Sequence, residues 1–206
     1  MALVTVSNNS LTAVTALPAS IPTGALTLIK SITASSSASI IFKNGVDGLV
    51  LDNSYKSYVF KFINCHPSAD GVNFQFQVGT GTDDTYNEVI TSTYVVSYHA
   101  EADNDQAAEY NGAHDQAQGT SFQTLCNSVG ADNDQQVSGT LLFNGFADST
   151  YVKHFIGDIQ NAYSADVTYR HLVAGYVNTP TALSRIQFKF SSGNIDDGII
   201  KLYGVK

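Results

Sequence analysis

The chain has 206 residues, which is enough for one domain with a full hydrophobic core. Ten Lys and Arg against eighteen Asp and Glu give a net charge of −8, which opposes binding to nucleic acid through its phosphates. The longest apolar runs are too short to span a membrane, and the N-terminus lacks the basic head and apolar stretch of a signal peptide. The sequence therefore predicts synthesis in a cytoplasm, no membrane insertion and no nucleic-acid partner.

The composition favours strands over helices. Aromatic residues make up 11% of the chain and are all Tyr or Phe, whereas charged residues make up only 14%. Aromatic side chains fit half-buried pleated surfaces, while helices usually carry more Glu, Lys, Leu and Met. We therefore expect an all-β protein.

The first 24 residues differ from the rest of the chain. They carry no charged side chain, and Pro18 and Pro22 precede Gly24. Because proline fixes φ and removes a hydrogen-bond donor, this segment should be extended. We interpret residues 1–24 as an arm that anchors the protein on a neighbour, and a loosely held terminus is the alternative.

From residue 25 onward, short alternating runs are separated by clusters of Gly, Asp, Asn and Ser. The clearest is VNFQFQV at 72–78, in which Val and Phe alternate with Asn and Gln. This pattern predicts an antiparallel, jelly-roll-like β-sandwich over residues 25–206. The other expected strands are 25–33, 38–43, 55–64, 89–98, 139–146, 166–177, 185–190 and 199–205. YVKHFIGDIQNA at 151–162 could hold a turn of helix, which Gly157 would weaken.

Residues 99–137 are polar and weakly periodic, so we expect a long loop excursion from the sandwich. ADNDQ occurs in it at 102–106 and again at 131–135. Long loops on a rigid scaffold often carry function. The residues predicted to contact a partner protein or a glycan are Asp103, Asp105, Tyr110, His114, Asp132 and Asp134.

No motif predicts a metal, a cofactor or a catalytic residue. The segment DNDQAAEYNGAH at 103–114 departs from a calcium-binding EF-hand loop, because Ala108 stands at position six and His114 at position twelve. Solvated acidic loops are the simpler interpretation. The histidines lack metal-ligand spacing, and His171, in phase with alternating apolar residues, is predicted to be hydrogen-bonded on a strand face. The two cysteines lack CxxC spacing and are expected to be reduced.

The chain ends with SSGNIDDGIIKLYGVK at 191–206, a polar turn followed by an alternating run. We expect strands 185–190 and 199–205 to be antiparallel neighbours joined by this turn. Ile200, Leu202 and Tyr203 are predicted to lie on a final strand that completes the sandwich.

Three stretches together resemble a known module. They are TGALTLIKSITASSSASIIF at 23–42, YKSYVFKFINCHPSADGVNFQFQV at 55–78 and RIQFKFSSGNIDDGIIKLYGVK at 185–206. They are similar to a β-sandwich module of virion structural proteins in tailed bacteriophages, particularly phages of marine bacteria. The C-terminal signature, SSGNIxxGxIKLYGxK, is the most specific. Members of that family often carry a long fibre shaft ahead of the module, whereas about 24 residues precede it here.

The resemblance implies a jelly-roll-like sandwich displayed on a phage particle as a capsid decoration or as part of a tail or head fibre. It supplies no catalytic residue. We therefore expect a non-enzymatic virion protein, assembled as a homo-oligomer such as a trimer and docked on other virion proteins by its arm. The alternatives are a carbohydrate-binding module that recognises a host-surface glycan through residues 99–137, and a depolymerase that cleaves host polysaccharide.

Overall fold

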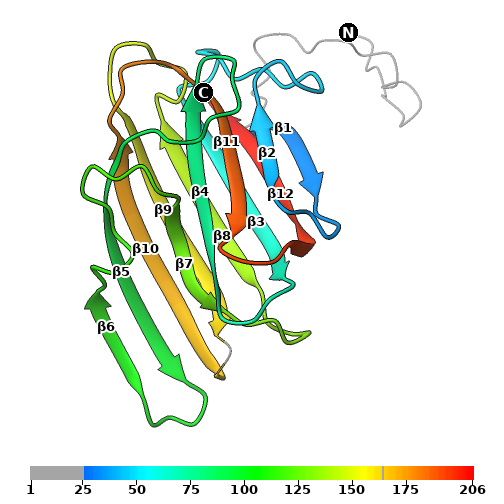
Figure 1. Cartoon of the computed structure of the whole chain (residues 1–206), viewed down its shortest axis with the longest axis vertical. Helices are drawn as coiled ribbons and strands as arrows, with labels where there is room; N and C mark the ends of the chain where they lie inside the picture. Colours follow the sequence, from blue (N-terminus) through cyan, green and yellow to red (C-terminus); the bar gives the residue numbers. More distant parts are fainter. Residues whose placement is uncertain (1–25, 164) are drawn as a thin grey trace, which may run out of the picture.

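The computed structural model describes residues 26–163 and 165–206. The predicted arm, 1–24, lies outside these residues. The described residues form strands and no helix, and Figure 1 shows their arrangement. The strands are β1 (Leu26–Thr33), β2 (Ile40–Lys43), β3 (Ser57–Pro67), β4 (Val72–Thr80), β5 (Ile90–Ala100), β6 (Gln106–Tyr110), β7 (Gln123–Val129), β8 (Val137–Asn144), β9 (Lys153–Tyr163), β10 (Val167–Val177), β11 (Leu183–Phe190) and β12 (Ile195–Val205).

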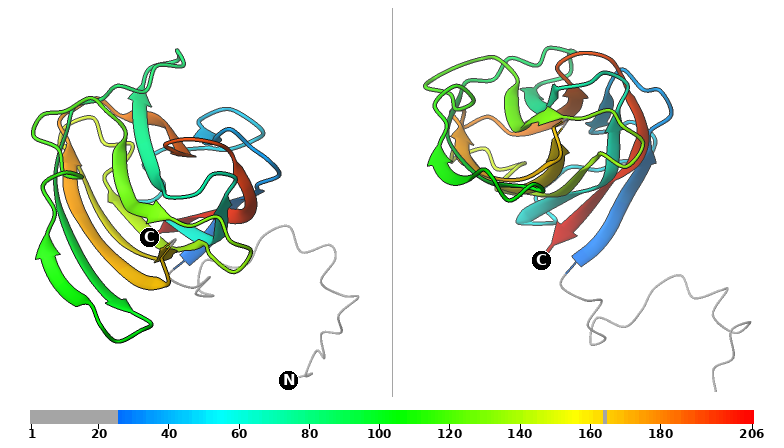
Figure 2. Two further views of the ribbon diagram at one scale, coloured as in Figure 1. Left: turned by 60° about the horizontal axis from the view of Figure 1, so that its bottom comes forward. Right: turned by 90° about the horizontal axis from the view of Figure 1, so that it is seen from below.

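The strands form two layers, both antiparallel. The large sheet has the order β1-β12-β3-β8-β9-β10-β5-β6, and the small sheet has the order β7-β4-β11-β2. Strand β7 also touches β9 through one residue pair, Val129 and Tyr163, which links the two layers at a corner. Figure 2 shows that the large sheet is strongly curved and partly surrounds the small one.

The winding of the chain confirms a jelly-roll-like sandwich. Connections β5–β6, β8–β9 and β9–β10 are hairpins within the large sheet. At each of the other connections the chain crosses to the opposite sheet. Repeated crossing between two antiparallel sheets is the jelly-roll arrangement.

A cluster of phenylalanines joins the two sheets. Phe188 of β11 has its ring centroid 6.4 Å from Phe42, 5.2 Å from Phe60, 5.1 Å from Phe62 and 6.1 Å from Phe74. All five side chains are buried. Each such aromatic pair adds about 0.5–1.5 kcal/mol beyond the burial of its area. This cluster is the centre of the core.

Two cations are fully buried. Lys153 is in phase with the buried apolar residues of β9, whereas Arg185 is in phase with the polar Gln187 and Lys189 of β11. The guanidinium of Arg185 donates to the carbonyls of Thr80 and Thr85 and pairs with Asp83. The ammonium of Lys153 donates to the carbonyl of Tyr151 at 2.6 Å, and also to those of Thr179 and Pro180. Their hydrogen bonds to carbonyls offset the cost of burying the charges and fix the loops that supply those carbonyls.

The prediction of a helical turn at 151–162 was wrong, because this segment is strand β9. Every second side chain from Lys153 to Asn161 is buried, which is the period of a strand. Lys153 and Asn161 are polar members of that buried set, so the alternation was not visible as an apolar pattern.

The prediction that residues 99–137 leave the sandwich was also wrong in part. Strand β6 adds to the edge of the large sheet, and β7 belongs to the small sheet. Leu125 and Cys126 of β7 are fully buried. Gln123 and Thr124 are buried beside them, and these polar residues hid the strand in the sequence.

The final strand completes the large sheet, as predicted, since β12 lies between β1 and β3. Ile200 and Leu202 are fully buried, and Tyr203 faces outward and is half-buried. The predicted pairing of 185–190 with 199–205 was wrong, because β11 lies in the small sheet between β4 and β2. The polar turn at 191–194 crosses between the sheets.

We predict that Leu202→Ala lowers the free energy of unfolding by about 2–5 kcal/mol, because it opens a cavity between the sheets. Deleting residues 199–206 should leave β1 and β3 without their shared partner and give insoluble protein. Chemical denaturation measures the first effect, and Lys201→Ala, which faces outward on the same strand, is the control. A deletion variant with an unchanged melting temperature would contradict the role of β12.

Candidate functional site

Acidic side chains gather where the turns of the large sheet meet, at the end of the sandwich away from the C-terminus (Figure 1). The β5–β6 and β9–β10 turns are joined by a hydrogen bond from the Glu101 amide to the Asp166 carbonyl, at 3.0 Å. The β7–β8 connection reaches the same place, because Asp132 and Asp134 line a 380 Å³ hollow with Glu101 and Asp166. Asp103 and Asp105 lie in the β5–β6 turn. We call this the acidic end; its members are Glu101, Asp103, Asp105, Asp132, Asp134 and Asp166.

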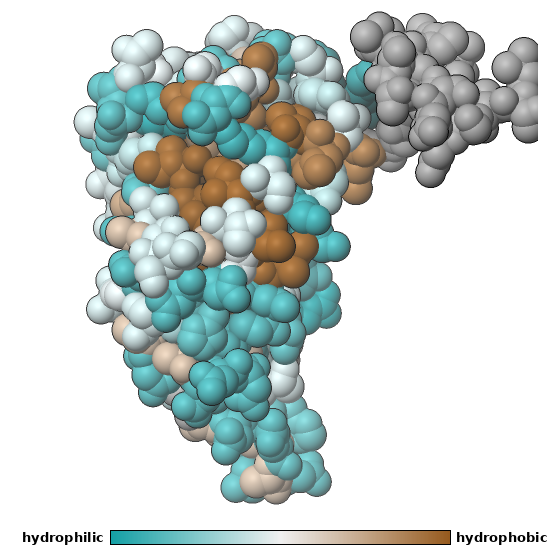
Figure 3. Space-filling view, turned by 90° about the vertical axis from the view of Figure 1, so that its right-hand side faces the viewer, coloured by the Kyte–Doolittle hydropathy of each residue, from teal (hydrophilic) through white to brown (hydrophobic). Residues whose placement is uncertain are grey.

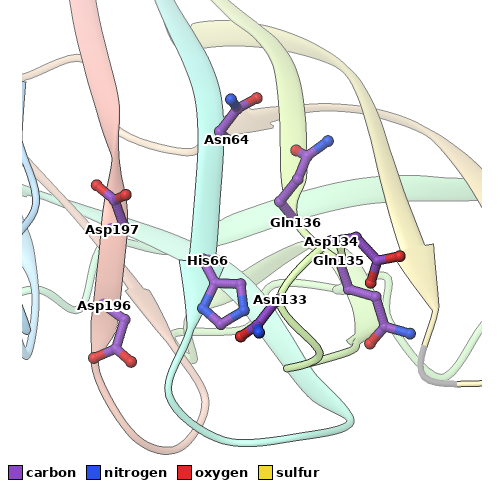
Figure 4. A pocket seen from close by; sticks show the side chains of 8 residues that line it. All are labelled: Asn64, His66, Asn133, Asp134, Gln135, Gln136, Asp196 and Asp197. Atoms are coloured by element: carbon purple, nitrogen blue, oxygen red, sulfur yellow. The ribbon is translucent and has the colours of Figure 1, made fainter.

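A second hollow, of about 620 Å³, adjoins the acidic end and is shown in Figure 4. Asp196 and Asp197 of β12 lie on one side of it, residues 133–136 on the other, and His66 between them. The His66 Nε2 atom lies 3.1 Å from the Asp132 carbonyl oxygen. Asp134 lines both hollows, so the acidic surface continues from one to the other.

The carboxylates of the acidic end are spread over separate turns. Within residues 26–163 and 165–206, no three His, Cys, Asp or Glu side chains come close enough to hold one metal ion. The acidic end therefore offers no set of three carboxylates for calcium within these residues. Hard cations need several oxygen ligands at about 2.3–2.6 Å.

Three tyrosines form a cluster on the inner face of the large sheet, close to the acidic end. Tyr98 of β5 and Tyr169 of β10 are paired in register, with ring centroids 5.1 Å apart. Tyr163, at the end of β9, is 5.2 Å from Tyr169. All three are half-buried, since the small sheet ends at β7 while the large sheet continues through β10, β5 and β6. We call Tyr98, Tyr163 and Tyr169 the tyrosine cluster.

The surroundings of the cluster favour the protonated hydroxyl at Tyr98 and Tyr169. Desolvation raises the pKa of Tyr98, and the negative charges of Asp105 and Glu109 add to the effect. Desolvation is also the largest cause of the raised pKa of Tyr169. The nearby tyrosines and the same two carboxylates raise it further. The cluster therefore offers aromatic faces and hydroxyl donors beside carboxylate acceptors, a combination that suits an uncharged polar ligand.

A buried polar network lies next to the tyrosine cluster. His171 is fully buried, with Nδ1 2.8 Å from the Tyr94 hydroxyl and Nε2 2.7 Å from Asn161 Oδ1. The Asn161 amide group donates to the Asn127 carbonyl, so Oδ1 accepts from His171. The prediction that His171 is hydrogen-bonded on a strand face is confirmed. Desolvation lowers its pKa to about 3, so the ring is neutral near pH 7.

Tyr110 and His114 do not join the acidic end. Tyr110 ends β6 with 55% of its surface exposed, and its hydroxyl is hydrogen-bonded to Asp115. The His114 ring packs 5.3 Å from the ring of Tyr94, and burial lowers its pKa. The structure thus brings Asp103, Asp105, Asp132 and Asp134 to one end of the sandwich and places Tyr110 and His114 elsewhere.

Both cysteines are free and buried, as expected. Desolvation raises the pKa of Cys65 to about 12 and raises that of Cys126 further. A thiol whose pKa is raised in this way is a poor nucleophile and a poor metal ligand near pH 7.

The tyrosine cluster was not predicted from the sequence. Tyr94, Val96 and Tyr98 alternate along β5, and Tyr169, His171 and Val173 alternate along β10. That alternation places each set on one face of its strand. The signal was present, but the pairing of two strands about 70 residues apart could not be known. Comparison with known proteins adds no candidate, since no family model, curated protein or solved structure matches the chain.

We predict that His171 makes stability depend on pH. Its pKa is about 3 in the folded state and near 6.5 when unfolded, so the unfolded state binds the additional proton between these values. Stability should therefore fall as the pH drops through this window, by about 2 kcal/mol between pH 7 and pH 5.

Thermal unfolding of His171→Gln across this range tests the prediction. The variant should lose that part of the pH dependence, whereas the exposed control His154→Gln should keep it. Parallel pH profiles for His171→Gln and the unaltered chain would contradict the prediction.

Proposed function

We propose that this protein is a non-enzymatic structural protein of a bacteriophage particle, present as a homo-oligomer and docked on neighbouring virion proteins. The three stretches that resemble the phage module support this proposal, and they correspond to strands β1–β4, β11 and β12. The observation that carries it is the division of the surface into an apolar region and an acidic end. Such a division suits a protein that attaches at one side and presents the other.

The apolar region lies around β1 and the β2–β3 loop. Figure 3, viewed from the right-hand side of Figure 1, shows apolar residues gathered in its upper part and hydrophilic residues below. An ion pair from Lys30 to Asp47, at 3.1 Å, holds the loop beside β1. The exposed residues of the apolar region, from 41% to 56% exposed, are Leu26, Leu28, Ile41, Val46 and Val50. We call this set the apolar edge.

An apolar edge of this kind supports docking. Contiguous apolar surface on a protein usually marks a contact with another molecule. Residues 1–24 are joined to the domain here, because Leu26 begins β1. An anchoring segment and an apolar surface at the same edge would act on the same neighbour and leave the acidic end facing away.

Antibody labelling of intact particles tests this function, and the label should be found on the virion. A chain that begins at Gly24 should keep its melting temperature, because the core contains β1–β12, but should be recovered from particles in smaller amount. Full recovery of the shortened chain would contradict the anchoring role of residues 1–24. Absence of label from particles would contradict the proposed function itself.

The tyrosine cluster favours a second candidate, recognition of a host-surface glycan. Its aromatic faces, hydroxyl donors and nearby carboxylates suit an uncharged sugar, and the net charge of −8 opposes an anionic one. This site lies near the acidic end, away from the apolar edge, so docking and recognition would be compatible.

We predict that Tyr98→Ala weakens binding to neutral host polysaccharide by roughly tenfold, because it removes one aromatic contact. Titration calorimetry measures the change, and Tyr151→Ala, at a tyrosine that is 72% exposed in the β8–β9 connection, is the control. The polysaccharide should keep its full length during the measurement. Equal affinities for the two variants would exclude this site, and shortened polysaccharide would favour a depolymerase.

A further inference from the structure

An apolar row crosses the outer face of the large sheet, where a sheet that faces water would carry polar side chains. The residues of the row are neighbours in register on six successive strands. They are Leu28, Tyr203, Val59, Leu142, Ile156 and Ala174. Leu28 and Ile156 are 52% and 54% exposed, and the other four are half-buried. The row thus carries the apolar surface from the apolar edge across the middle of the sheet.

The middle three residues of the row are symmetric about strand β8. Val59 and Ile156 flank Leu142 on either side, so each is one strand away from it. A two-fold rotation about an axis along β8 would place Val59 of one copy opposite Ile156 of a second copy. Leu142 would then meet its own counterpart. Two apolar side chains of similar size would face each other at each of these positions.

The charged residues beside the row have the same symmetry with opposite signs. Lys61 and Asp158 flank Thr140 in register, one strand away on either side. The same rotation would place Lys61 of each copy opposite Asp158 of the other. Within the described part of the chain, Lys61 belongs to no salt bridge. Asp158 is held by Arg170 through two hydrogen bonds of 2.7 and 2.9 Å, which fixes its carboxylate on this face.

The outer face of the small sheet differs. Its residues in the corresponding middle rows are Gln75 of β4, and Gln187 and Lys189 of β11, which are polar. Lys189 lies over the Phe122 ring, 4.1 Å from its centroid. The apolar row is therefore a property of one face of the sandwich.

We propose that the outer face of the large sheet binds a second copy of this chain, face to face, across a two-fold axis along β8. The middle of the apolar row and the Lys61–Asp158 arrangement select this occupant, because an unrelated partner would not require either to be symmetric about one strand. This inference rests on the proposed homo-oligomer. It makes that oligomer a dimer in place of the expected trimer. Two sheets packed in this way would lie about 10 Å apart.

Light scattering and chemical cross-linking of the full chain test the pair. The mass in solution should be twice 22.0 kDa. Thr140→Cys, exposed on β8, should be cross-linked to its counterpart by a short bismaleimide. Gln187→Cys, on the small sheet, is the matched control and should remain uncross-linked. Cys65 and Cys126 are buried and should not react.

Charge reversal gives a second test that does not depend on cross-linking. Lys61→Glu and Asp158→Lys should each weaken self-association by about tenfold or more, because each sets like charges opposite one another. An equal mixture of these two variants should associate again, since the carboxylate introduced in one copy then meets the ammonium introduced in the other. Circular dichroism and the melting temperature establish that each variant is folded.

Three outcomes would overturn the proposal: a monomer in solution, a trimer, or a dimer for which the equal mixture of the two charge-reversal variants fails to regain association. Ile156→Lys should also dissociate the pair, and an unaffected pair would count against this face. Antibody labelling of particles is independent of these measurements. A failure of the pair can therefore be distinguished from a failure of the virion function.

Discussion

The contact of Phe188 with Phe42, Phe60, Phe62 and Phe74 is the interaction on which the rest of this structure depends. It joins four strands of the two sheets, and its members come from positions about 150 residues apart. Because the chain crosses between sheets at most connections, neither sheet can form alone from a continuous segment. The apolar faces of both sheets are buried only when this centre closes, so stability and topology arise together.

The unequal width of the two sheets then determines where polar chemistry appears. Around Phe188 each inner face has a partner, and its side chains are apolar. Beyond β7 no strand lies opposite the inner face of the large sheet. The β6–β7 connection covers part of it, with His114 packed on Tyr94, and tyrosines and hydrogen-bonded polar groups join the apolar side chains there. His171 lies at this change, fully buried yet bonded at both ring nitrogens. The tyrosine cluster is thus a consequence of a sheet that extends past its cover.

The sequence predicted the fold class because alternation and composition act locally. It also predicted the final strand, whose buried Ile200 and Leu202 alternate visibly. Strand β9 was missed because Lys153 and Asn161 occupy buried positions whose carbonyl and side-chain partners come from elsewhere in the chain. Pairing was harder still, since β11 and β12 are adjacent in the sequence but lie in different sheets. The candidate site depends on such pairings, so only its acidic turns could be expected.

The outer faces of the two sheets differ in the kind of residue that alternates with the buried side chains. A strand with one face in water alternates apolar and polar residues, whereas a strand covered on both faces has a continuous apolar run. Strand β8 contains Leu141, Leu142 and Phe143 in succession, with Leu141 and Phe143 buried between the sheets. Leu142 is the outward member, and stability within one copy does not require it to be apolar. The other outward residues of β8, Ser138, Thr140 and Asn144, are polar, so Leu142 is the one apolar side chain on that face of the strand, and the proposed pair would cover it.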